Sequence, residues 1–405
     1  MKNQLTGQTS LFDDSNSTHF SDTGVHDKTR LAELQALPLE RKIMITQARI
    51  IEWYSRWKGQ VYVSFSGGKD STVLLHIARQ CFPDIEAVFV NTGLEYPEIQ
   101  KFAKSFDNVT VVRPAMSFVE VIKQCGYPVI SKEISDCLFY GRKALVINET
   151  GVHSRSRLAR LRGELLQPDG TPSIYNCEKY EPLLHTDFVI GGECCKVMKK
   201  SPTKHFTERT GKKPIIATMA TESKLRKQQW LKNGCNGFNM KHPKSNPMAF
   251  WTEQDVLEYI RRYELPIAPV YGDVIPTNNG CKLCTTGCDR TGCIFCGFGV
   301  HTPGDDRFIR LRETHPRQYE YCINGGEYAW VGYHKANVKW KRIEFYNEDG
   351  SPMTQEEIET FVEQYKGDPR FAFEKVWQPN KQGLGMGHVF DEINKIYGEN
   401  FIRYK

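Results

Sequence analysis

The sequence predicts an α/β protein built on a parallel sheet with helices on both faces. Short β-rich segments alternate with segments whose apolar residues recur at helical spacing, the usual pattern of such a sheet. A glycine-rich turn joins the first strand, expected over residues 61–65, to the helix that follows it, expected over residues 71–80. With 405 residues, 40% hydrophobic and 25% charged, the chain can bury a core and suggests roughly two or three domains.

The remaining elements follow from the same two periodicities. Apolar residues between 31 and 57 allow one or two helices before the first strand. Thr252 opens a Thr-Glu-Gln-Asp capping signal ahead of another helix. Further strands are expected at 85–91, 109–113 and 214–218, and further helices at 118–125 and 223–231.

Composition divides the chain into four parts. Residues 1–28 are polar and are expected to form a disordered tail, and residues 29–270 to form the α/β domain. Within that domain, residues 130–213 do not alternate cleanly and indicate a basic, helical insertion. Residues 271–330 form a Cys-rich segment, and 331–405 a small accessory region with a hairpin near 341–350 followed by helices.

The apolar runs are too short to span a bilayer, and the first residues lack the apolar core of a signal peptide. We therefore expect a cytoplasmic protein with no membrane span. In that reducing compartment the thirteen cysteines favour metal or redox chemistry over disulfides. The net charge of +6 neither identifies nor excludes a nucleic-acid partner.

The most informative segment is the loop between the first strand and the first helix. Its glycines allow close approach of a ligand, and the free amides at the helix start favour an anion. Lys69 adds positive charge, and the serine and threonine residues add hydroxyl donors. A Walker A loop would need glycine where Val63 stands. The candidate phosphate-binding residues are Ser66, Gly67, Gly68, Lys69, Asp70, Ser71 and Thr72.

This loop resembles the PP-loop of the adenine nucleotide alpha hydrolase superfamily, and within it the phosphoadenosine phosphosulfate reductase family. The Asn91-Thr92-Gly93 segment resembles that family's motif after the second strand. The segment from Thr218 to Arg226, with Glu222, resembles the one after the later strand. The adjacent Cys194 and Cys195, with the later cysteines, resemble the iron–sulfur members.

The resemblance implies that ATP or a related adenine nucleotide binds at the carboxyl ends of the strands. It implies that the loop holds the β- and γ-phosphates, with Lys69 and Asp70 as catalytic residues and Asn91, Thr92, Gly93, Glu222 and Arg226 at the nucleotide. ATP would then be cleaved between its α- and β-phosphates, and AMP transferred to a substrate oxygen. Asp70 is a candidate Mg²⁺ ligand, with a helix N-cap as its alternative role.

Three departures from the family pattern argue against reduction of activated sulfate. Met219 and Ala220 stand where sulfonucleotide reductases carry a Gly-x-Arg type segment, and Asn91 replaces an aspartate. The reductases use a cysteine near the C-terminus, whereas the last cysteine here is Cys322. Three hypotheses remain: an adenylylating enzyme active in sulfur transfer or nucleic-acid modification, a sulfonucleotide reductase, and a non-catalytic module that senses a nucleotide or docks to DNA.

Five cysteines lie within sixteen residues, at positions 281, 284, 288, 293 and 296, and indicate a metal centre. Spacing alone does not separate zinc from a [4Fe–4S] cluster, since both accept four thiolates. The family resemblance favours the cluster. It implies Cys288, Cys293 and Cys296 as ligands, with Cys194 or Cys195 as the fourth.

Two basic runs, Arg155–Arg162 and Lys196–Lys213, predict DNA or tRNA as a partner, with a solvated surface as the simpler interpretation. The resemblance adds a sulfur-donor protein as an expected partner. The residues Gln8–Phe12 resemble the short sequence by which bacterial proteins bind the sliding clamp, a weak signal at this length.

Overall fold

The computed structural model describes residues 26–147, 151–337 and 339–405. The chain folds as two compact units, which we describe separately. The first unit comprises residues up to 89, 101–110 and 207–289, and the second comprises 90–100, 111–206 and 290–405. The two units interleave along the sequence, and the domain boundaries expected near residues 270 and 330 stay predictions. The clamp-like residues Gln8–Phe12 lie outside the described residues.

The central sheet has the strand order β3-β2-β1-β5-β7-β6. Parallel pairing joins β1 to β2 on one side, with Val63 opposite Ala87, and to β5 on the other, with Val63 opposite Ile215. The predicted parallel α/β fold is therefore confirmed, with one difference: β6 pairs antiparallel with β7. The strands are β1 (Val61–Phe65), β2 (Ala87–Val90), β3 (Val109–Val112), β5 (Lys213–Ile216), β6 (Asn236–Gly237) and β7 (Lys244–Ser245).

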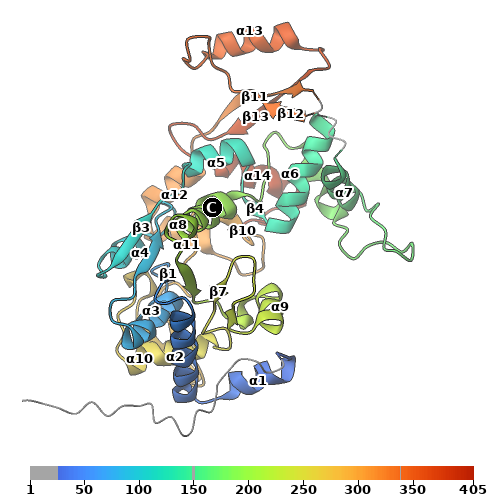
Figure 1. The fold of residues 1–405 in the computed structure, drawn as a ribbon. Helices are drawn as coiled ribbons and strands as arrows, with labels where there is room; N and C mark the ends of the chain where they lie inside the picture. The colour runs from blue at the N-terminus through green and yellow to red at the C-terminus, as the bar shows by residue number, and fades with distance from the viewer. Residues whose placement is uncertain (1–25, 148–150, 338) are drawn as a thin grey trace, which may run out of the picture. The chain divides into compact units, whose positions relative to one another are not determined.

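Helices of the first unit pack their apolar faces around this sheet (Figure 1). Trp53, Phe250 and Trp251 are fully buried in the resulting core. The expected tail ends earlier than residue 28, because Asp27 caps the first helix. The helices are α1 (Lys28–Ala36), α2 (Leu39–Arg56), α3 (Lys69–Cys81), α4 (Pro97–Lys104), α9 (Lys224–Asn233) and α10 (Glu253–Arg262), with short 3₁₀ turns η3 (Ala220–Glu222) and η4 (Pro269–Tyr271).

The Cys-rich segment of the first unit forms a small hairpin. Strands β8 (Val274–Pro276) and β9 (Leu283–Thr285) pair antiparallel, with Ile275 opposite Cys284. Cys281 is exposed at the turn between them, and Cys288 is buried just beyond β9.

The second unit contains the insertion, which is helical as expected. The helix α5 (Phe118–Cys125) precedes it. The helical segments within residues 130–213 are α6 (Lys132–Val146), α7 (Val152–Leu161), the 3₁₀ segment η1 (Glu178–His185), the π-helical segment η2 (Lys196–Lys200) and α8 (Ser201–Thr210). Two short strands, β4 (Val129–Ile130) and β10 (Gly297–Phe298), pair in parallel and connect the insertion with the residues after the cysteines.

The accessory region is a three-stranded antiparallel sheet against which α13 lies (Figure 1). The turn near Asn347–Gly350 is present, but the hairpin forms earlier, between β11 (Glu327–Ala336) and β12 (Lys339–Arg342). The remaining elements are α11 (Arg307–Thr314), α12 (Pro316–Ile323), α13 (Gln355–Tyr365), β13 (Phe371–Gln378) and α14 (Met386–Tyr397). Within the described residues, no helix is both long and apolar enough to cross a membrane.

Candidate phosphate loop and thiol cluster

The glycine-rich loop lies between β1 and α3, as predicted. Gly67 has a φ of 72°, a left-handed conformation that suits glycine. Gly68 is the N-cap of α3 and has no side chain with which to cap it, and the first helical amide, that of Lys69, donates to the Tyr271 hydroxyl at 3.4 Å. The Ser71 and Thr72 hydroxyls donate to the Gly68 carbonyl at 2.9 and 3.0 Å. The loop therefore has the backbone arrangement of an anion-binding helix start.

Asp70 lies in the first turn of α3, so the alternative role as N-cap is wrong, because Gly68 occupies that position. A carboxylate in the first turn interacts favourably with the helix dipole. Its expected role as a Mg²⁺ ligand stays a prediction.

Lys69 is the most constrained residue of the loop. It is only 4% exposed. Its Nζ donates to Glu253 Oε1 at 2.7 Å and to the carbonyl oxygen of Asp289, and lies 5.6 Å from the ring centroid of Tyr271. The lysine therefore has a carboxylate, a carbonyl and an aromatic ring as neighbours, all from the first unit.

The segment after β2 forms a turn in the second unit, and its Leu94 carbonyl accepts a hydrogen bond from the Ile294 amide at 2.7 Å. Thr92 donates to the buried Glu95 carboxylate from its amide, at 3.1 Å, and from its hydroxyl, at 2.7 Å. Asn91 Oδ1 accepts a hydrogen bond from the Gly93 amide at 3.1 Å. Asn91 thus closes a turn, and its role at a nucleotide stays a prediction.

The segment after β5 is ordered by Glu222. Its carboxylate accepts a hydrogen bond from the Met219 amide at 2.8 Å and forms an ion pair with Arg226. Met219 and Ala220 are 3% and 5% exposed and pack in the core. Two buried apolar residues therefore occupy the positions where the sulfonucleotide reductases carry their Gly-x-Arg type segment.

Four thiols of the second unit influence one another electrostatically. Cys194 and Cys195 directly precede η2, and Cys293 and Cys296 lie in the loop before β10. The hydrogen bond from Cys194 lowers the pKa of Cys195 to about 5, with help from Lys132 and Lys199 against the effect of burial. The same bond, with burial and the charges of the other three thiols, raises the pKa of Cys194.

The two later thiols respond mainly to burial. Burial raises the pKa of Cys293 to about 11, and the nearby Lys199 opposes the shift. Burial also raises the pKa of Cys296. Among the described residues, no three His, Cys, Asp or Glu side chains are arranged to hold a metal ion. The thiol neighbours are thus Cys194, Cys195, Cys293 and Cys296, and the five-residue ligand set that includes Cys288 stays a prediction.

Several residues of the basic runs are internally paired. Arg157 binds Asp136 at 2.8 Å, Arg160 binds Glu133 at 2.5 Å, and Lys212 binds Glu86 at 2.6 Å. These ion pairs serve the fold, and nucleic acid as a partner stays a prediction.

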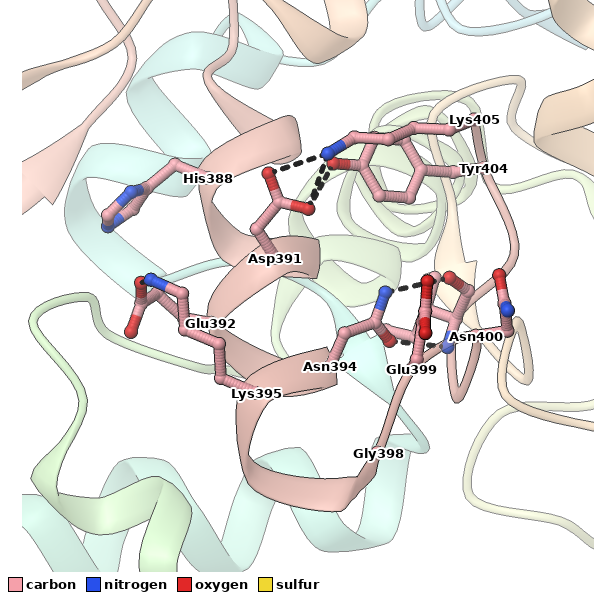
Figure 2. Close-up of a pocket in the computed structure, with 11 residues that line it drawn as sticks. His388, Asp391, Glu392, Asn394, Lys395, Gly398, Glu399, Asn400, Tyr404 and Lys405 are labelled. Carbon is pink, nitrogen blue, oxygen red and sulfur yellow. Dashed lines mark hydrogen bonds and ion pairs between the residues drawn. The ribbon is translucent and has the colours of Figure 1, made fainter.

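A cavity of about 670 Å³ lies beside α14 in the second unit (Figure 2). Asp391 in its wall accepts hydrogen bonds from the Tyr404 hydroxyl, at 2.6 Å, and from Lys405 Nζ, at 2.8 Å. Asn394 binds both backbone groups of Ile402. No residue expected at the functional site lines this cavity.

Comparison with known proteins gives the family. Residues 60–127 and 165–297 match the model described as "Phosphoadenosine phosphosulfate reductase domain". The chain belongs to the phosphoadenosine phosphosulfate reductase family. The match includes the loop, both segments that resemble family motifs and all the clustered cysteines.

Relatives of this family member include an adenosine 5′-phosphosulfate reductase from Bacillus cereus (strain B4264). It is 24% identical over 242 residues, covering 58% of this chain and 78% of that protein. An uncharacterized protein from Methanocaldococcus jannaschii is 34% identical over 94 residues, so this chain spans only 23% of that relative. The solved phosphoadenylyl-sulfate reductase from Candida auris, a phosphate complex, aligns with 60% of this chain and 90% of its own at 13% identity and a TM-score of 0.31.

The sequence did not indicate which residues surround the Lys69 ammonium and the Cys195 thiol. Glu253, Tyr271 and Asp289 meet Lys69 across about two hundred residues of sequence, and no local pattern marks them. Lys132 and Lys199 act on Cys195. Lys199 had one signal available, because it lies one helical turn after Cys195.

Proposed function

We propose that this member of the phosphoadenosine phosphosulfate reductase family binds ATP through Ser66–Thr72 and cleaves it to AMP and pyrophosphate. One observation carries the proposal: the loop ends at a helix start whose N-cap is glycine and whose first residue is a buried lysine. Amides, helix dipole and lysine together favour a multiply charged phosphate end.

The reaction transfers AMP to an oxygen of a substrate. That oxygen forms a bond to the α-phosphorus, the bond between the α-phosphorus and the bridging oxygen breaks, and pyrophosphate leaves. The loop stabilises the charge that develops on the leaving pyrophosphate. Lys69 supplies the positive charge, and the hydroxyls of Ser66, Ser71 and Thr72 can reorient to donate.

Asp70 is the residue that we assign to Mg²⁺. A carboxylate oxygen is a ligand that Mg²⁺ prefers, and the metal usually reaches a protein together with the phosphates it accompanies. When bound, Mg²⁺ would neutralise part of the phosphate charge.

Two observations favour this reaction over reduction of a sulfonucleotide. The Met219 and Ala220 side chains are buried and apolar, so they offer a sulfate no positive charge. Cys322 is fully buried, and burial raises its pKa well above the ordinary value, so it is a poor nucleophile. The name of the Bacillus cereus relative makes adenosine phosphosulfate reduction the second candidate.

We further propose a [4Fe–4S] cluster held by Cys194, Cys195, Cys293 and Cys296, with zinc as the alternative. Support comes from the chemistry of the donors: four thiols from two segments of one unit are electrostatic neighbours, and one is a thiolate at neutral pH. A cluster there would cross-link the two segments and could exchange electrons. The nearby Lys199 offsets the negative charge of bound thiolates.

The deciding experiment gives the anaerobically purified protein each substrate in turn. With ATP and candidate acceptors such as tRNA or DNA, we expect pyrophosphate and AMP bound to the acceptor oxygen, and Lys69→Ala should abolish the formation of both. With adenosine phosphosulfate or phosphoadenosine phosphosulfate and thioredoxin, we expect no sulfite. Sulfite release at about one turnover per second or faster would overturn the proposal in favour of the second candidate.

A further inference from the structure

Glu253 is placed at the loop by the start of α10. Thr252 is the N-cap of this helix, and its hydroxyl oxygen accepts a hydrogen bond from the Asp255 amide while the Asp255 carboxylate accepts one from the Thr252 amide. This capping box fixes the first turn, where Glu253 is the first helical residue. Its carboxylate oxygen Oε1 lies 2.7 Å from Lys69 Nζ.

The ammonium group of Lys69 is enclosed on several sides. Besides Glu253 it donates to the Asp289 carbonyl, so two of its three N–H groups are used. The Tyr271 ring lies 5.6 Å away, and the Tyr271 hydroxyl accepts a hydrogen bond from the Lys69 amide at 3.4 Å. The side chain of Lys69 is 5% exposed, whereas that of Glu253 is 41% exposed.

The asymmetry of exposure decides how an anion can reach the lysine. A phosphate oxygen cannot approach an ammonium whose side chain is only 5% exposed unless a neighbour moves. The Asp289 carbonyl is part of the backbone, and the Tyr271 ring belongs to a buried side chain, so neither can move aside easily. The Glu253 carboxylate is the half-exposed neighbour, and its rotation into water costs the least desolvation.

We propose that Glu253 is a positioning residue that holds Lys69 as an internal counter-ion and is displaced by the β,γ-phosphates of the nucleotide. The inference rests on the proposed function and deepens it, because it assigns to the loop the pyrophosphate end of the ligand. A molecule in which Lys69 is paired with Glu253 cannot bind the pyrophosphate end. The apparent affinity for the nucleotide is therefore the intrinsic affinity multiplied by the fraction of molecules in which Lys69 is unpaired. If about nine-tenths of the molecules are paired, the reduction is about tenfold.

The test compares the binding of inorganic pyrophosphate, ATP and AMP to the full chain by calorimetry. Glu253→Gln keeps the size of the side chain and removes its charge, so pyrophosphate and ATP should each bind about three- to tenfold more tightly. AMP lacks the β- and γ-phosphates, so its affinity should change less than about twofold. Unchanged pyrophosphate affinity, or equal tightening for AMP, would overturn the inference.

Two controls separate this role from a structural one. Glu258→Gln removes a carboxylate of the same helix that pairs with Arg262, and it should leave all three affinities unchanged. In a Lys69→Met background, Glu253→Gln should no longer tighten pyrophosphate binding, because its effect acts through the lysine. Tightening that persists there would contradict the inference. Glu253→Ala, with melting temperature measured alongside, serves as the second variant.

Failure of the inference is distinguishable from failure of the proposed function. If the wild-type protein and every variant bind neither ATP nor pyrophosphate, the proposed function falls. If the wild-type protein binds both and Glu253→Gln binds them no better, only the role of Glu253 falls.

Discussion

The thiols of Cys194 and Cys195 share a hydrogen bond, and their pKa values move in opposite directions. The pKa of Cys195 falls to about 5, whereas that of Cys194 rises. Lys132 and Lys199 stabilise the negative charge on Cys195. The negative charge of this coupled pair is therefore favoured on Cys195, and Cys194 is the thiol that donates to it.

In metal-free protein, Cys195 should react with iodoacetamide faster than Cys81 and Cys125 do, because burial raises the pKa values of those two thiols. Because a thiol with a pKa of about 5 is already ionised, its alkylation rate should stay nearly constant between about pH 6 and pH 8. An ordinary thiol would gain about tenfold per pH unit over that range. Timed quenching and peptide mass spectrometry measure the rates.

The control for this prediction is Lys132→Met, which removes one of the two cations. It should raise the pKa of Cys195 and restore part of the pH dependence. A tenfold rise per pH unit in the unsubstituted protein would contradict the assignment of Cys195 as the thiolate.

Lys69→Ala should weaken ATP binding by about 1.5–3 kcal/mol, the range for a hydrogen bond to a charged group. The substitution removes the ammonium at the helix start and leaves Glu253 facing the loop without its counter-ion. Calorimetry on the wild-type and substituted proteins gives the difference. Lys232→Ala, in the last turn of α9, is the matched control and should bind ATP like the wild type. Equal affinity in the two substituted proteins would remove the loop from the nucleotide site.

Anaerobically purified protein should be brown and contain about four irons per chain if one cubane cluster is present. Cys293→Ser and Cys296→Ser should each abolish the cluster. Cys81→Ser should retain it, because Cys81 lies in α3, outside both cysteine segments. Iron, sulfide and zinc analyses check this, and a colourless protein with one zinc would establish the zinc alternative.

Asp255→Ala should destabilise the protein by about 3–5 kcal/mol, the cost of breaking a buried ion pair. Lys42 is 2% exposed and pairs with Asp255 at 2.7 Å, so the substitution leaves a buried ammonium without its counter-ion. It also removes the capping box of α10. Urea unfolding measures the loss. Glu258→Ala on the exposed face of the same helix should cost less than about 0.5 kcal/mol. If both variants lost a similar free energy of unfolding, the cause would be a change in helix α10 and not the loss of the Lys42–Asp255 ion pair.

Local signals account for what the sequence could predict. The strand Val61–Phe65, the helix Phe118–Cys125 and the cap Thr252 each depend on neighbours within a few residues, and each appears in the structure as expected. The position of the loop was also predictable, because glycines, hydroxyl residues and a lysine follow one another directly between the strand and the helix.

Contacts between distant segments account for what could not be predicted. Strands β11 and β13 are paired through residues such as Val331 and Glu374, and nothing near either residue specifies its partner. The counter-ion of Lys69 is likewise set by how α10 packs against α3. The cysteines were recognised as a group, but spacing alone could not select which thiols would become neighbours.

The long separation between β1 and β5 has a consequence for synthesis of the chain. β1 pairs with β2 almost at once along the sequence, whereas its other neighbour, β5, follows only after roughly 150 further residues. At about 5–20 residues per second, one edge of β1 waits on the order of ten seconds or more for its partner. During that interval a hydrophobic strand with unpaired amides and carbonyls lies open to other chains. The strand that carries the glycine-rich loop is thus open to pairing with other chains while the rest of the protein is synthesised.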